Sequence, residues 1–134
     1  MTLRATGSFK VSLNPLDLNE VGDNEMRARI SINKQFSGDL EASSVGEMLS
    51  AMGSVKGSAG YVAIEHVTGT LQGRKGSFIL QHTGTMNRGA PSLSVTVVPD
   101  SGTGQLAGIS GSLSIDIREG VHYYGLDYRL EGLS

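Results

Sequence analysis

The sequence predicts an all-β protein, a small closed or nearly closed antiparallel β-barrel of seven to eight strands. Glycine makes up 19 of the 134 residues, about twice the usual share, and is spread along the whole chain. Short runs in which apolar and polar residues alternate lie between these glycines, as in half-buried strands joined by tight turns. A sheet of this size most simply avoids exposed edges by closing, and eight strands leave room for side chains or one small ligand.

The composition bounds the class of protein. A chain of 134 residues with 38% hydrophobic residues can build one core, so residues 1–134 are predicted to form a single domain. The net charge of −2 comes from intermixed acidic and basic residues, with no basic face and no tryptophan for base stacking, so no nucleic-acid partner is expected. Cysteine is absent, which excludes disulfides, thiolate metal sites and cysteine catalysis.

No segment of the sequence suggests a membrane or secretory address. The first 13 residues contain no apolar signal segment, and no run approaches the roughly 18 apolar residues that span a bilayer. We therefore expect a cytoplasmic protein with no membrane partner.

Two strands are predicted in the first third of the chain, at residues 6–13 and 26–36, with a polar, acidic loop at 14–25 between them. Pro15 ends the first strand, because proline cannot donate a hydrogen bond to a neighbouring strand. The inward-facing residues are Phe9, Val11 and Leu13 in the first strand and Ala28, Ile30, Ile32 and Phe36 in the second.

Residues 40–52 can be interpreted in two ways. The pattern Ser44-x-x-Glu47 before two apolar residues fits the capping box of a helix over residues 44–52. We favour a strand, because the run is short, contains Gly46 and follows a hairpin-type turn at Ser37-Gly38-Asp39.

The central element is a predicted hairpin of residues 61–71 and 76–86, with its turn at residues 72–75. Pairing the threonine-rich faces of the two arms places Glu65 directly opposite His82. Both then lie on the apolar face, with Val67, Leu71, Phe78 and Leu80. The opposite parity would bury Gln81 with Glu65 and turn His82 outward. We favour the first pairing because it separates hydroxyl groups from hydrocarbon.

The remaining strands are predicted from a repeat and from alternation. The spacing Thr-Gly-x-Leu-x-Gly-x-x-Gly-Ser at residues 68–77 recurs at residues 103–112, which predicts a second hairpin of the same design. Before it, residues 92–98 form a strand that is interrupted by a bulge at residues 99–102. After it, Leu113, Ile115 and Ile117 form an inward-facing series. The last strand covers residues 123–130, where Tyr124, Leu126, Tyr128 and Leu130 alternate with the other side chains.

Four segments resemble a bacterial family of uncharacterised proteins with an allene-oxide-cyclase-like barrel: FSGDLEASSVGEML (36–49), the central hairpin (61–86), VVPDSGTGQLAGISG (97–111) and YGLDYRL (124–130). The resemblance implies an antiparallel barrel and often a homo-oligomer. The plant namesakes cyclise fatty-acid epoxides, mainly by holding an apolar substrate in shape with help from a carboxylate and bound water. A fold does not fix a function, so isomerase or cyclase activity is only an implication for this chain.

Glu65 and His82 are the candidate catalytic residues. A carboxylate on an apolar face is costly unless it is paired, and burial would raise its pKa and suit it to act as a general acid or base. His82 would polarise it or carry a proton. Both residues also fit a purely structural role, as a pair that ties two strands together.

The candidate ligand-binding residues are Tyr61, Tyr124 and Tyr128, which would line the barrel, and Gln81 if the opposite parity holds. No metal or cofactor is predicted, because the three histidines lack a metal-ligand spacing and the glycine-rich stretches lack phosphate-loop order. We expect a barrel that binds a small apolar or amphipathic molecule and isomerises or cyclises it. The alternative is a non-catalytic barrel, structural or oligomer-forming, in which Glu65 and His82 are structural.

Overall fold

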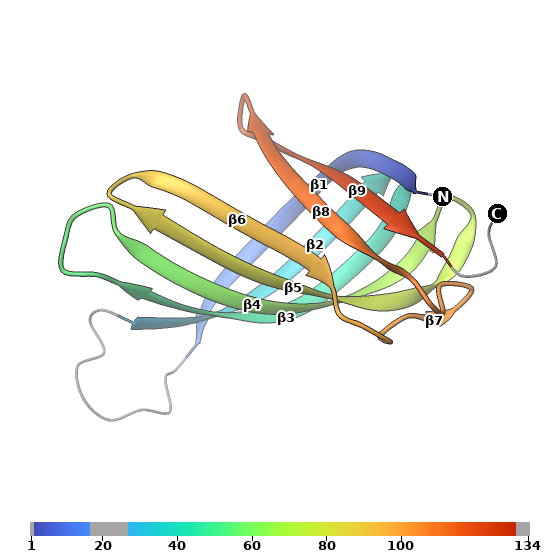
Figure 1. Cartoon of the computed structure of the whole chain (residues 1–134), viewed down its shortest axis with the longest axis horizontal. Helices are drawn as coiled ribbons and strands as arrows, with labels where there is room; N and C mark the ends of the chain where they lie inside the picture. The colour runs from blue at the N-terminus through green and yellow to red at the C-terminus, as the bar shows by residue number, and fades with distance from the viewer. Residues whose placement is uncertain (1, 17–26, 131–134) are drawn as a thin grey trace.

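The computed structural model describes residues 2–16 and 27–130, which form one antiparallel sheet (Figure 1). The strands are β1 (Leu3–Leu16), β2 (Arg27–Gly38), β3 (Leu40–Met52), β4 (Ala59–Leu71), β5 (Arg74–Asn87), β6 (Ala90–Val97), β7 (Thr103–Gly104), β8 (Ser110–Arg118) and β9 (Val121–Arg129). The two described ranges contain no helix, and hence none long and apolar enough to cross a membrane.

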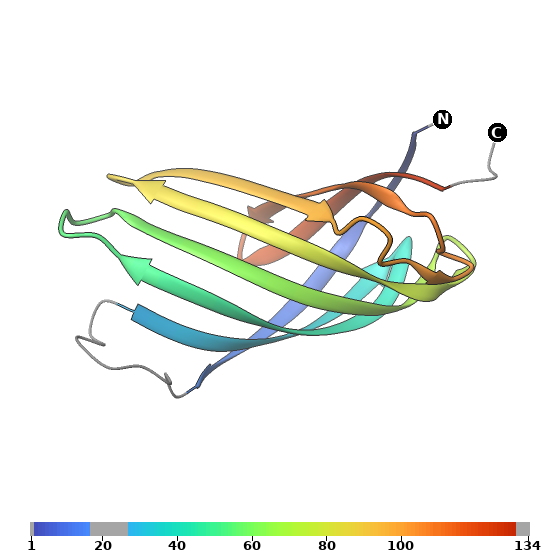
Figure 2. The same cartoon turned by 60° about the horizontal axis from the view of Figure 1, so that its bottom comes forward.

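Eight of these strands close into a barrel, as the alternation predicts. The sheet runs β4-β3-β2-β1-β9-β8-β6-β5, and β4 also pairs with β5, so the cylinder is complete. The short β7 lies beside the start of β5 as a ninth strand. Figure 2 shows the strands crossing the barrel at a marked tilt, which closure of an eight-stranded sheet requires.

The central hairpin has the predicted parity but a different register. Its turn is only two residues long, Gln72 and Gly73, with φ angles of 45° and 87°. Two consecutive positive φ angles match the right-handed twist of the flanking strands. The shorter turn shifts the pairing by two residues, so His82 lies opposite Ala63, and Glu65 lies opposite Leu80. The prediction of a direct Glu65–His82 pair is therefore wrong, although both side chains face inward.

The predicted second hairpin is also wrong. Thr103 and Gly104 pair with β5, and β8 pairs with β9, so the two arms of the repeat do not pair with each other. The segment between them folds inward through successive turns and buries Leu106 and Ile109 in the core. Burial of these two apolar side chains favours an inward connection over an extended arm.

The strand pairing decides two questions about the first half of the chain: whether residues 40–52 form a strand or a helix, and where β1 ends. Residues 40–52 form a strand, as favoured, and the capping-box pattern starts no helix. Strand β1 continues through Pro15 to Leu16, beyond its predicted end. At Pro15, β1 has only β2 as a neighbour, because its pairing with β9 ends at Phe9. The missing N–H of Pro15 therefore interrupts no ladder with β9. Most of the predicted loop at 14–25 lies outside the described residues.

The interior of the barrel is divided into two halves. The turns after β3, β5 and β8 lie at one end, and the turns after β2 and β4 lie with β7 at the other (Figure 1). At the β7 end, called the closed end below, the core side chains are almost fully buried: Phe36, Leu40, Leu71, Phe78, Leu80, Leu106, Leu126 and Tyr128. At the other end, called the open end, inward-facing apolar side chains stay exposed: Leu13, Met52, Met86, Leu93 and Ile117.

One junction of the barrel is much weaker than the others. Strands β6 and β8 pair only at Thr96 and Ser112. Every other neighbouring pair in the eight-stranded ring shares a ladder of at least seven residue pairs. In Figure 1 the β8–β9 hairpin diverges from β6 toward the open end.

Tyr124 on β9 holds the β2–β3 turn in place through hydrogen bonds of its hydroxyl group. Its hydroxyl accepts a hydrogen bond from the backbone N–H of Leu40 and donates to the carbonyl of Ser37, both at 2.9 Å. We expect Tyr124→Phe to lower the free energy of unfolding by about 1–3 kcal/mol, because the buried N–H of Leu40 loses its partner. Urea denaturation measures the change. Tyr123→Phe, on the outer wall of the same strand, is the control, and an equal loss there would contradict the assignment.

Candidate functional site

Glu65 and His82 meet inside the barrel, at the boundary between its closed and open halves. Nε2 of His82 lies 2.7 Å from Oε1 of Glu65, on the diagonal between neighbouring strands β4 and β5. Glu65 is fully buried and His82 is nearly so. Toward the closed end the next inward residues are Val67 and Leu80, both completely buried, so the pair lies at the edge of the hydrocarbon core.

Two further polar residues complete a buried cluster that we call the Glu65 cluster: Lys34, Ser44, Glu65 and His82. The ammonium group of Lys34 donates to Oε1 of Glu65 at 3.1 Å, and the hydroxyl of Ser44 donates to Oε2 at 2.5 Å. The Lys34 Nζ also lies 4.8 Å from the centre of the Phe9 ring, a cation–π distance. Glu65 thus receives hydrogen bonds from three side chains on three strands.

Sequence reasoning missed Lys34 and Ser44, although a signal for both was present. Lys34 occupies the inward position between Ile32 and Phe36, and Ser44 follows Leu40 and Ala42 in the same way. A lysine at an inward position requires a buried counter-charge, because an unpaired ammonium group is costly inside a core. Glu65 is the carboxylate that this lysine contacts.

The pKa of Glu65 is lowered, not raised as predicted from burial alone. Burial is the largest single influence and raises the pKa. The hydrogen bond from His82, the charge of Lys34, the hydrogen bond from Ser44 and the charge of His82 together outweigh it and hold the pKa below the ordinary 4.5. Glu65 is therefore ionised near neutral pH and holds no proton to donate as a general acid.

This pKa shift predicts how stability depends on pH. In the unfolded chain Glu65 binds a proton more readily than in the folded barrel, so its contribution is complete above the unfolded pKa. That contribution is lost as the pH falls through the lower folded value. We expect the difference in unfolding free energy between the wild-type protein and Glu65→Gln to shrink from about pH 6 to about pH 3 in urea titrations. A difference independent of pH would contradict the lowered pKa.

The other predicted site residues are not part of the Glu65 cluster. Gln81 points outward from β5 and is exposed. Tyr124 faces inward and holds the β2–β3 turn, and Tyr128 donates to the side-chain oxygen of Gln72 near the closed end. Tyr61 faces inward at the open end, half-buried, with its ring against Gly84. Only Tyr61 lies where the barrel interior is exposed.

The described pockets do not include the Glu65 cluster. A pocket of about 480 Å³ lies at the rim of the open end, where Met52, Ala59 and Met86 contribute inward-facing side chains. A groove of about 700 Å³ lies on the outer wall over β2 to β5, and Leu49 and Val62 are among its lining residues. Met52 and Met86 are the exposed, inward-facing side chains among the lining residues of the rim pocket, and Tyr61 and Leu93 are not among them.

The other histidines lie apart from this cluster. His66 points outward from β4, and the ring of His122 packs on Phe9 with centroids 5.1 Å apart. Across residues 2–16 and 27–130, no three histidine, aspartate or glutamate side chains come together in a way that could hold a metal ion.

Comparison with known proteins finds a family and a solved structure. The sequence profile of a family described as a protein of unknown function (DUF3224) matches residues 5–128. The crystal structure of a protein with unknown function from the DUF3224 family of Shewanella oneidensis MR-1 is similar, with a TM-score of 0.91 and 47% sequence identity. The match covers 98% of this chain and 99% of that one. No curated protein matches this chain.

Proposed function

Because this chain belongs to the DUF3224 family of proteins of unknown function, we propose a function from its own geometry: it binds one small apolar or amphipathic molecule at the open end of the barrel. The observation that supports this most is the exposure of inward-facing apolar side chains there. Leu93 exposes 43% and Met52 exposes 63% of its surface, although both face the barrel axis. Apolar surface of this kind gains free energy when an apolar molecule covers it.

The side chains at the open end suit an adaptable apolar site. Met48 and Met52 on β3 and Met86 on β5 all face inward, and β4 lies between these two strands, with Ala59 paired to both Met52 and Met86. Methionine is unbranched and polarisable, so it adjusts to ligands of different shapes. The rim pocket, at about 480 Å³, is of the size that small-molecule sites have.

The polar end of such a molecule would meet Tyr61. Within the described residues its hydroxyl has no hydrogen-bond partner, and its ring already forms part of the inner wall against Gly84. A hydroxyl can both donate and accept, so alcohols, carbonyl compounds and carboxylic acids all fit this position. Deeper in the barrel, Lys34 carries hydrogen-bond donors beyond the one used by Glu65.

Binding can be tested with the fluorescent probe Nile red and by native mass spectrometry of the protein purified from cells. We expect Nile red fluorescence to rise on binding, and Leu93→Asp to reduce its affinity at least tenfold because it places a charge on the apolar interior. Ser12→Asp, outward on β1, is the matched control. Failure of the wild-type protein to bind Nile red or to retain any co-purifying molecule would reject the proposal.

A second candidate is proton transfer to or from the bound molecule, the step that an isomerase or cyclase would need. The 2.7 Å contact between His82 and the ionised Glu65 supports it, because a carboxylate that orients an imidazole favours its action as a base. His82→Gln should then abolish conversion of a co-purifying molecule while binding persists.

The structural alternative is supported by the three hydrogen bonds that already occupy Glu65. It predicts that Glu65→Gln and His82→Ala both lower the melting temperature while Nile red still binds to the folded fraction. Loss of binding with unchanged stability would favour a ligand site instead.

A further inference from the structure

One side of the outer wall carries almost no charge. Outward-facing positions on β4 (60–70), on β5 (77–85) and on β6 (92–96) include no aspartate, glutamate, lysine or arginine. We call this surface of β4, β5 and β6 the uncharged wall. The outward side of the neighbouring β3 borders it and carries Glu41 and Glu47 among its apolar residues. The opposite side of the barrel bears charges on β1, β8 and β9: Arg4, Lys10, Asp116, Arg118, Asp127 and Arg129.

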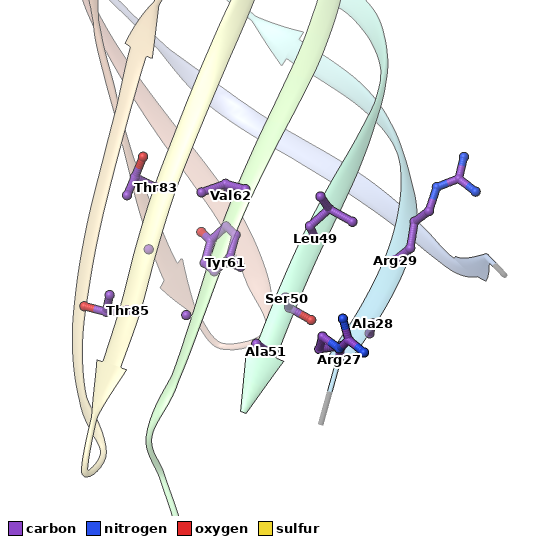
Figure 3. A pocket seen from close by; sticks show the side chains of 12 residues that line it. Arg27, Ala28, Arg29, Leu49, Ser50, Ala51, Tyr61, Val62, Thr83 and Thr85 are labelled. Carbon is purple, nitrogen blue, oxygen red and sulfur yellow. The ribbon is translucent and has the colours of Figure 1, made fainter. Parts of the chain in front are cut away.

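Large apolar side chains are exposed on the uncharged wall and on its β3 border. Val45 and Leu49 on β3 and Val62 and Ile64 on β4 each leave between 51% and 61% of their surface open to solvent. Leu49 lies directly opposite Val62 in the ladder, and Figure 3 shows the two on neighbouring strands within the groove. Ile64 lies opposite Glu47, so the apolar surface is centred on Leu49 and Val62. Exposed apolar side chains gathered in this way are typical of a protein interaction site.

The uncharged wall and its β3 border together have a size that suits a dimer interface. Four strands spaced by about 4.8 Å and about ten residues long at about 3.3 Å each cover roughly 600 Å² in projection. The accessible area of such a surface is larger than its projection, and a stable interface needs about 800 Å² per partner. Depletion of charged residues at the centre, with polar residues around it, is the composition that such interfaces have.

We propose that a second copy of this chain packs against the uncharged wall, sheet face to sheet face, about a two-fold axis. Two β-sheets pack in this way at a separation of about 10 Å, with their side chains interdigitated. The groove of about 700 Å³ beside Leu49 and Val62, which Arg27 and Arg29 also line, receives apolar side chains of the other copy. Nucleic acids and anionic membranes are recognised through clustered basic groups, and the outward positions at 60–70, 77–85 and 92–96 carry none, so neither fits the uncharged wall.

The charges at the margin are compatible with self-association. Arg29 donates a hydrogen bond to Glu47 at 2.7 Å at the edge of the wall, so both signs of charge are present there. A surface of single sign would repel its own copy, whereas a mixed margin does not. The same face can therefore meet itself under two-fold symmetry, which makes every contact occur twice.

Sedimentation velocity and native mass spectrometry test the proposal. We expect the wild-type protein to have twice the 14.1 kDa mass of one chain. Val62→Glu and Leu49→Glu should each raise the dimer dissociation constant at least a hundredfold, because a charge is then buried in an apolar contact. Lys10→Glu, outward on β1 on the opposite side of the barrel, is the matched control and should leave the mass unchanged.

Circular dichroism first establishes that each variant keeps its β-sheet. If Val62→Glu does not fold, Val62→Thr keeps the β-branched shape and should still weaken the dimer. A wild-type chain that stays monomeric at tens of micromolar, alone or bound to a different protein, overturns the proposal. A dimer that survives Val62→Glu and Leu49→Glu, or that Lys10→Glu dissociates, also overturns it.

Discussion

Replacing Glu65 by glutamine is expected to lower the free energy of unfolding by about 3–5 kcal/mol, the usual cost of breaking a buried ion pair by removing one partner. The substitution removes the charge that Lys34 contacts, and the lysine side chain is only 7% exposed. The ammonium group would then remain buried beside Phe9 without a counter-charge. Urea denaturation with far-ultraviolet circular dichroism measures the loss.

A double-mutant cycle separates the ion pair from the rest of the cluster. Lys34→Met combined with Glu65→Gln removes both charges and keeps an amide for His82 and Ser44 to contact. We expect the double variant to lose less stability than the sum of the two single variants, by about 1–3 kcal/mol. Strictly additive losses would contradict a direct Lys34–Glu65 interaction. Glu47→Gln is the matched control, because this carboxylate also pairs with a basic residue but lies on the outer wall, and little change is expected.

The second large effect is a difference in unfolding free energy between substitutions at the closed end and at the open end of the barrel. Phe36→Ala should lower the unfolding free energy by about 3–5 kcal/mol, because the ring is completely buried at the closed end. Its centroid lies 5.5 Å from those of Phe9 and Tyr124, so its removal leaves a cavity among aromatic rings. Leu93→Ala, inward at the open end, should cost less than about 1 kcal/mol because the side chain is already 43% exposed.

The comparison of these two variants tests whether the closed end of the barrel provides stability and the open end provides the binding surface. Under the proposed function, Leu93→Ala should weaken Nile red binding while stability stays near that of the wild-type protein. Equal destabilisation by Phe36→Ala and Leu93→Ala would mean that the open end is packed like the core, and the proposed binding position would then be rejected.

Alternation in the sequence, together with the separation of hydroxyl groups from hydrocarbon in the central hairpin, was enough to predict that Glu65 and His82 face inward. It placed Glu65 and His82 on one face because that depends only on whether positions are odd or even along each strand. Register was a different problem, since it depends on turn length. A turn of two residues at Gln72-Gly73, where four were predicted, moved His82 from Glu65 to Ala63 as its direct partner. The contact survived because diagonal neighbours on one face are still within reach.

Other features are not encoded in alternation at all. Leu80 and Leu93 are both leucines that face inward, yet Leu80 is completely buried and Leu93 is 43% exposed. The difference arises because Leu93 lies nearer the open end of the barrel. The repeat at residues 103–112 formed no hairpin, and burial of its Leu106 does not explain the difference, because the equivalent Leu71 of the first copy is buried just as completely. Lys34 could have been found, since its position in an apolar series already required a partner.

The single residue pair between β6 and β8 bears on how this barrel moves. Separating these strands breaks few backbone hydrogen bonds, whereas parting any other neighbours breaks a full ladder. We expect the amides of residues 90–95 and 113–118 to exchange with deuterium earlier than those of β3 and β4. The β8–β9 hairpin would then move away from β6 as a rigid unit, while its ladder with β1 stays intact. Under the proposed function, such an opening would let a molecule enter through the side of the barrel, whatever the width of the rim.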